Sequence, residues 1–173
     1  GEGGGWLAHE RLGYNYRLSD ISAALGSAQI DRIDQIIDRR QAVAAVYGKL
    51  LGAVKELSIP FIAEEVTRMS WFVYVVRLAE SFTREDRDFV IQQLSQQGIG
   101  ANSYFQPIHL QPFYVKRFGF KEGDFPITER IGQRTIALPF HNQLTPETAA
   151  NVVGKLTDAL AKLPSRRRSS APR

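Results

Sequence analysis

Apolar residues recur at helical spacing over a long segment that follows Ser19, a favourable helix N-cap. Asp20, in the first turn, suits the positive end of a helix dipole. We therefore expect one linking helix over residues 19–51, of about 32 residues and about 48 Å, with Gly52 as its stop. Such a length exceeds the usual globular helix, which indicates an element that joins two parts of a larger protein or packs against a partner. The apolar positions are Ile21, Leu25, Ala28, Ile33, Ile36, Ile37, Val43, Val46, Tyr47 and Leu50.

The middle of the chain predicts a strand, a helix and a second strand. Ser70–Ala79 is rich in β-branched and aromatic residues, which favour strands. The segment Thr83–Asp86 resembles a capping arrangement that opens a helix to Gln97, with Gly98 after it. Ile99–Phe105 predicts the second strand, so this part forms a compact α/β unit.

The C-terminal part predicts short elements and one longer helix. Pro107–Phe118 is irregular, with a short helix from Gln111, and a helix over Phe125–Arg134 precedes a strand over Thr135–Leu138. Thr145, followed by proline and glutamate, is a strong start for a helix that ends near Leu163. The fold class is therefore α/β, an α+β small domain over residues 52–163 that follows the linking helix.

Composition agrees with one ordinary soluble domain. The 173 residues are 43% hydrophobic and 23% charged. No apolar run approaches the roughly 20 residues that cross a bilayer. The absence of cysteine excludes disulfides, thiolate nucleophiles and cysteine-ligated metals, and agrees with a reducing, cytoplasmic location. Because the chain begins at Gly1 without a methionine, we expect a fragment of a longer protein.

The net charge of +4 comes from the C-terminal tail, residues 164–173. Four of the 22 basic residues lie there without any acidic residue, so the rest of the chain is balanced by its 18 acidic residues. A basic tail can bind phosphate backbones, but such an end is more often solvated and disordered. We expect a disordered tail, no nucleic-acid partner and no membrane partner.

Several kinds of site are absent from the sequence. Neither common glycine-rich phosphate loop occurs, and His9, His109 and His141 have no metal-ligand spacing between them. The lysines all lie in polar or helical stretches, without the apolar surroundings that activate a Schiff-base lysine. The sequence therefore predicts no metal site and no lysine suited to Schiff-base chemistry.

The segment Arg11–Asp20 places an amide, two phenols and two guanidiniums directly before a helix start. Such groups suit an anion such as a phosphate. The alternative is that Tyr14 and Tyr16 anchor the loop to a core while Arg17 pairs with an acid. Composition alone favours this structural alternative.

The segment Asn102–Tyr114 alternates polar and aromatic residues directly after a predicted strand. Loops in that position often carry ligand contacts. A proline-fixed loop with packed aromatic rings explains the same pattern equally well.

At these two segments the chain resembles the DegT/DnrJ/EryC1/StrS family of fold-type I, pyridoxal-phosphate-dependent sugar aminotransferases. The similarity runs from Trp6 to Leu163 through landmarks that occur in order. The first is quite specific, and the others gain weight as an ordered set. They are LGYNYR from Leu12 to Arg17, SWFVYVV from Ser70 to Val76, Tyr104 with HLQP from His109 to Pro112, and ALPFH from Ala137 to His141 followed by LTPE from Leu144 to Glu147.

The resemblance implies a homodimer whose active sites lie between the subunits. By this match Asn15 contacts the phosphate of the partner subunit's pyridoxal phosphate, which cycles through pyridoxamine phosphate, with Arg17 and Tyr14 beside it. Tyr104 and His109 match a segment near the amino-sugar substrate. The implied activity transfers an amino group from an amino acid, glutamate in most relatives, to a keto-sugar nucleotide in polysaccharide or antibiotic biosynthesis.

The family's Schiff-base lysine, its aspartate at the pyridine nitrogen and its main phosphate loop all precede the GYNYR segment and are not in this sequence. We therefore expect the chain to be inactive alone. Two alternatives stay open. One is a non-catalytic truncated paralogue or interaction module, and the other is a dehydratase of the same family, in which histidine replaces that lysine.

Overall fold

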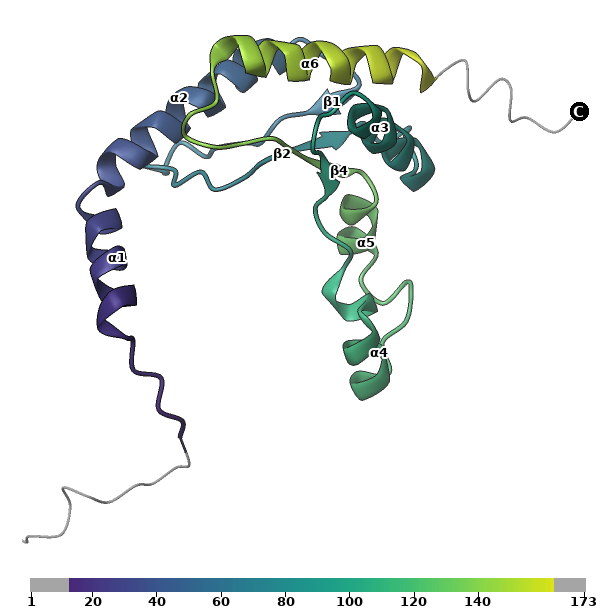
Figure 1. The fold of residues 1–173 in the computed structure, drawn as a ribbon. Helices are drawn as coiled ribbons and strands as arrows, with labels where there is room; N and C mark the ends of the chain where they lie inside the picture. Colours follow the sequence, from purple (N-terminus) through teal and green to yellow (C-terminus); the bar gives the residue numbers. More distant parts are fainter. Residues whose placement is uncertain (1–12, 164–173) are drawn as a thin grey trace, which may run out of the picture. The chain divides into compact units, whose positions relative to one another are not determined.

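The computed structural model describes residues 13–163 (Figure 1). The expectations for the opening glycines and for the basic tail at 164–173 lie outside the described residues. The chain divides into two compact units that meet between Asp34 and Gln35, and each is considered by itself.

The first unit contains an extended stretch from Gly13 and the helix α1 (Asp20–Ile30). Ser19 is the N-cap as expected, because its hydroxyl accepts the backbone N–H of Ser22 at 3.3 Å. No residue of α1 is buried. Its apolar side chains, such as that of Ile21 at 86% exposure, are therefore left open to solvent.

The prediction of one continuous helix over residues 19–51 was wrong. Helix α2 (Ile33–Leu51) begins after a turn at Asp31 and Arg32. There the Arg32 N–H bonds the Gln29 carbonyl at 3.1 Å, which is the tighter i−3 pattern of a 3₁₀ turn. The apolar repeat continues through the turn, so periodicity alone does not reveal the interruption. The expected stop at Gly52 is confirmed, and a Cβ there would lie 2.9 Å from the Gly48 carbonyl oxygen.

The second unit is built around a four-stranded sheet in the order β1-β2-β4-β3, with every neighbouring pair antiparallel. Central strand β4 matches its predicted bounds, and β2 is shorter than expected. Strand β2 begins only at Tyr74, which pairs with Leu138. The residue after Leu138 is Pro139, which has no backbone N–H with which to extend the pairing. The strands are β1 (Leu57–Ser58), β2 (Tyr74–Leu78), β3 (Asn102–Ser103) and β4 (Thr135–Leu138).

The strand expected over Ile99–Phe105 is reduced to the two residues of β3. The N–H of Ala101 bonds back to the Ile99 carbonyl at 3.1 Å, so it is used within the chain and not in the ladder. Strand β1, in turn, was not expected from the sequence. It is a short edge strand that pairs Leu57 with Leu78.

The predicted helix starts are confirmed by their caps. In α3 (Arg84–Gln96) the Asp86 N–H donates to the Thr83 hydroxyl at 3.3 Å, and the Thr83 N–H donates to the Asp86 carboxylate at 2.9 Å. In α6 (Pro146–Ala161) the Thr145 hydroxyl accepts the N–H of Thr148. Between these two helices come the 3₁₀ turn η2 (Ile108–Leu110), α4 (Pro112–Phe118) and α5 (Pro126–Gly132).

The core lies between the sheet and helices α2, α3 and α6. In Figure 1, α6 runs across the sheet with α3 beside it, and these two helices are in contact. Strand β2 alternates in burial, with Val76 inward and Arg77 outward. Tyr47 of α2 is fully buried, and its hydroxyl donates to the Pro139 carbonyl at 2.8 Å, which ties α2 to the end of β4.

Replacing Leu156 with alanine should destabilise the second unit. Leu156 is fully buried on α6, so the change should lower the free energy of unfolding by about 2–5 kcal/mol. Urea unfolding followed by circular dichroism measures this. Asn151→Ala, at an exposed position of the same helix, should change stability by less than about 1 kcal/mol. Equal effects of the two changes would contradict this account of the core.

Candidate functional site

The loop from Gly13 to Arg17 presents its side chains to solvent. Tyr14 and Tyr16 are 78% and 87% exposed, and their ring centroids lie 5.8 Å apart. Arg17 forms no ion pair with any residue in the range 13–163. The alternative in which the tyrosines anchor the loop to a core and Arg17 pairs with an acid is therefore not the arrangement that the described residues adopt.

The loop is ordered locally by one contact. The side-chain oxygen of Asn15 accepts the backbone N–H of Arg17 at 3.2 Å, which is an Asx-type turn. This contact leaves the amide NH₂ of Asn15, the guanidinium of Arg17 and the phenols without partners among the described residues. These groups are donors that suit a phosphate. They line only an open surface, so they can contribute to a phosphate site but do not enclose one.

Tyr104 lies in the segment that follows β3, and its side chain is half-buried. Its ring stacks on Phe105 at 3.9 Å between centroids and lies 6.5 Å from Phe72. The Thr135 hydroxyl donates to the Tyr104 carbonyl at 2.7 Å, which fixes the backbone of this segment against β4.

His109, in η2, is buried and has a definite partner. Its Nε2 lies 2.8 Å from a carboxylate oxygen of Glu129 on α5. The same carboxylate accepts the backbone N–H groups of Gly123, at 2.9 Å, and of Phe125, at 3.2 Å. We refer to Glu129, His109, Gly123 and Phe125 as the Glu129 cluster, which joins η2 to the loop before α5.

The Glu129 cluster favours the charged carboxylate. The backbone N–H of Gly123, followed by His109 and Phe125, lowers the pKa of Glu129 below its usual 4.5, although burial acts in the opposite direction. Hydrogen bonds to an ionised group are stronger than neutral ones, so the cluster is a firm support for the segment that carries His109.

The structure does not bring the predicted substrate residues together through direct contacts. Tyr104 packs on Phe72 and Phe105, whereas His109 faces Glu129 and Phe125. The role of Glu129 as the partner of His109 was not predicted, because nothing in the sequence pattern pairs residues that are 20 positions apart. One signal was present, an acidic residue in the first turn of a proline-marked helix.

Two kinds of feature are absent from residues 13–163. In this range no group of three or more histidine, cysteine, aspartate or glutamate residues could hold a metal ion. None of the helices in this range has the length and apolar character needed to cross a membrane.

The chain belongs to the DegT/DnrJ/EryC1/StrS aminotransferase family, because the model of that family matches residues 3–157. The spore coat polysaccharide biosynthesis protein SpsC of Bacillus subtilis is 31% identical over 157 residues, which are 90% of this chain and 40% of SpsC. GDP-perosamine synthase of Caulobacter vibrioides is 32% identical over 150 residues, 86% of this chain and 39% of the synthase. The chain thus spans about two fifths of the length of these relatives.

Solved structures show the same fold. Spr1654 of Streptococcus pneumoniae, described as a sugar aminotransferase and solved in its PLP form, matches with a TM-score of 0.75 and 26% identity. The match covers 84% of this chain and 36% of Spr1654. The expected mixed α/β fold class, with helices and a small antiparallel sheet, is therefore confirmed.

Replacing Glu129 with glutamine should destabilise the protein in a pH-dependent way. Because the folded-state pKa lies below 4.5, the unfolded chain takes up the proton first as the pH falls. The stabilisation by the charged carboxylate is therefore complete above 4.5 and is lost as the pH falls through the folded-state pKa. The variant should be less stable than the wild type at about pH 7, and the gap should narrow towards about pH 3.

Urea unfolding at both pH values measures the difference in the free energy of unfolding between Glu129→Gln and the wild type. Glutamine keeps the size of the side chain, so the comparison isolates its charge. A gap of the same size at both pH values would show that the charge of Glu129 is not what holds the cluster.

Proposed function

We propose that this chain is the C-terminal portion of a pyridoxal-phosphate-dependent aminotransferase that moves an amino group from an amino acid such as glutamate to a keto-sugar nucleotide. The observation that carries the proposal is the exposed Tyr14–Arg17 loop before the capped start of α1, in a chain that belongs to this family. The names of SpsC and GDP-perosamine synthase support a sugar substrate in polysaccharide biosynthesis.

The residues of the loop fit the phosphate end of this cofactor. The Asn15 amide and the Arg17 guanidinium supply neutral and charged N–H donors, and the Tyr14 hydroxyl adds a third. Because the loop is open, we propose that it serves a site shared with a partner subunit in a homodimer. The PLP form of Spr1654 supports the identity of the cofactor. When bound, pyridoxal phosphate supplies the electron sink that amino transfer needs.

The segment from Tyr104 to His109 would form part of the substrate wall. Tyr104 offers a half-buried ring and a phenol, which can pack on a sugar and bond its hydroxyls. His109 is held by Glu129, so we propose that it acts mainly by setting the course of the segment. This role agrees with its burial and leaves direct substrate contact to the exposed edge of the segment.

The 173-residue chain alone should not carry out amino transfer. A lysine that binds the cofactor covalently is required by the family's chemistry, and the chain offers none in an apolar setting. Mixed with pyridoxal phosphate and L-glutamate, the chain should show weak cofactor binding and no conversion of glutamate to 2-oxoglutarate. A strong cofactor absorbance band that disappears when glutamate is added would refute this expectation.

Joining the chain behind the upstream portion of GDP-perosamine synthase should restore cofactor binding and reveal the role of Asn15. In this chimera Asn15→Ala should weaken the affinity for pyridoxal phosphate by about tenfold or more, because a hydrogen bond to a charged phosphate is lost. Fluorescence titration measures the affinity, and circular dichroism verifies folding. Asn151→Ala, exposed on α6, is the matched control and should have no effect.

The same chimera tests the phosphate contact and the alternative of a non-catalytic module. Equal affinity of the Asn15→Ala variant and its parent would remove the proposed phosphate contact. Amino transfer by the chimera would contradict the non-catalytic module, and cofactor binding without any turnover would support it. The dehydratase differs at the upstream lysine position, which the synthase portion supplies here, so that alternative is decided by the residue that precedes this chain in its own protein.

A further inference from the structure

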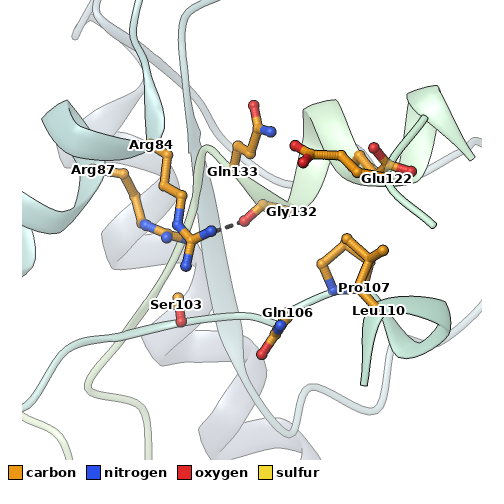
Figure 2. Close-up of a pocket in the computed structure, with 10 residues that line it drawn as sticks. Arg84, Arg87, Ser103, Gln106, Pro107, Leu110, Glu122, Gly132 and Gln133 are labelled. Carbon is orange, nitrogen blue, oxygen red and sulfur yellow. Dashed lines mark hydrogen bonds between the residues drawn. The ribbon is translucent and has the colours of Figure 1, made fainter. Parts of the chain in front are cut away.

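A cavity of about 140 Å³ lies within the second unit, between the start of α3, the segment after β3 and helix α5. Figure 2 shows the residues that line it. Pro107 and Leu110 form an apolar part of the wall, and the rest is polar. The charged and amide side chains are Arg84, Arg87, Gln106, Glu122, Glu129 and Gln133.

The guanidinium of Arg87 is a buried part of the cavity wall. Arg87 is 5% exposed, its Nε bonds Asp88 at 2.7 Å, and one terminal nitrogen donates to the Gly132 carbonyl at 2.9 Å. These two bonds fix the plane of the guanidinium, and its second terminal nitrogen has no hydrogen bond within the described part of the chain. A buried arginine with a fixed orientation is a preorganised donor for a carboxylate.

The shape of this wall depends on Gly132. A Cβ at Gly132 would lie 3.0 Å from the Phe105 carbonyl oxygen and 3.3 Å from Cδ of Pro107. Glycine thus allows α5 to approach the segment after β3 closely, which places the carbonyl that holds Arg87 at the edge of the cavity.

The two ends of the cavity carry opposite charge. Figure 2 shows Arg84 and Arg87 on one side and Glu122 on the other, with Gln133 and Gln106 between them. Within the described part of the chain, the one ion pair of Arg84 is a long contact of 3.9 Å to Asp88. Among residues 13–163, neither the Glu122 carboxylate nor the two amides have a hydrogen-bond partner, so their donors and acceptors are available to a ligand.

The charges also limit the class of ligand. A nucleotide or another polyanion would meet Arg84 and Arg87, but Asp88 already offsets these arginines, and the carboxylates of Glu122 and Glu129 would repel it. A simple cation would be repelled by the arginines. A small molecule that carries one charge of each sign satisfies both ends. The cavity volume of about 140 Å³ lies below that of most ligand pockets, which limits the ligand to a few heavy atoms.

We propose that this cavity binds a free amino acid, with its carboxylate towards Arg84 and Arg87 and its ammonium group towards Glu122. Gln106 and Gln133 donate and accept hydrogen bonds along its length. The cavity shares Gln106 and Pro107 with the segment proposed as the substrate wall. It uses none of the residues assigned to the cofactor phosphate, so the two proposals can be tested separately.

Calorimetric titration of the 173-residue chain tests this proposal. The probes are L-serine and γ-aminobutyrate, which carry both charges at different separations, and propionate and propylamine, which each carry one. At least one of the two zwitterions should bind about tenfold more tightly than either singly charged probe, since each lost charged contact costs about that factor.

Variants then locate the binding. Arg84→Gln and Glu122→Gln should each weaken binding of the preferred zwitterion by about tenfold, and both positions are exposed, so folding should be retained. After Glu122→Gln, propionate should bind at least as well as before. Lys116→Gln and Glu64→Gln are matched controls that change the same charges outside the cavity and should have no effect.

Three outcomes would overturn the proposal. They are equal binding of propionate and the zwitterions, no binding of either zwitterion, and binding that Arg84→Gln leaves unchanged. The Asn15→Ala variant distinguishes a failure of this proposal from a failure of the proposed function, because Asn15 does not line the cavity. It should leave zwitterion binding intact, and loss of binding in that variant would place the amino acid on the loop at Gly13–Arg17 instead.

Discussion

Antiparallel pairing of β2 with β4 is the constraint on which the second unit depends. It sets Val76 opposite Ile136, both fully buried, and gives α2, α3 and α6 one surface to cover. At the end of β2 the Leu78 N–H donates to the carbonyl of Arg134, the residue before β4, at 2.9 Å. The Arg134 guanidinium in turn donates to the Leu78 carbonyl. The segment between β2 and β4 therefore begins and ends side by side, at the same end of this short ladder.

Between β2 and β4 the chain forms the segment that carries Tyr104, His109 and the cavity. Helices α4 and α5 in this segment bury few residues, and a few polar contacts hold them in place. The Glu129 cluster joins η2 to the loop before α5, and Arg87 joins α3 to the end of α5 through the Gly132 carbonyl. Both contacts involve an ionised group with several partners, which makes them strong and directional. Both contacts involve helix α5, and Glu129, Gly132 and Arg87 all line the cavity.

The loop at Gly13–Arg17 has the opposite character. Its tyrosines are exposed, α1 buries nothing, and its own order comes from one Asx turn and one N-cap. Exposed aromatic and cationic groups in such a setting are typical of a surface that is completed by other polypeptide. This agrees with the length of SpsC and of the Caulobacter GDP-perosamine synthase, which are each a little more than twice as long as this chain.

Local chemistry determined much of the fold from the sequence alone. The N-caps at Ser19, Thr83 and Thr145 and the bounds of β4 depend on neighbouring residues, so pattern and capping rules were sufficient. The ordered landmarks likewise identified the family. Two local backbone bonds are not evident from the pattern and were found only in the three-dimensional structure. The i−3 bond at Arg32 breaks a helix whose apolar repeat is continuous, and the bond from Ala101 to Ile99 shortens β3. The pairs His109–Glu129 and Arg87–Gly132 join residues 20 and 45 positions apart, and such contacts arise only when the sheet brings their elements together.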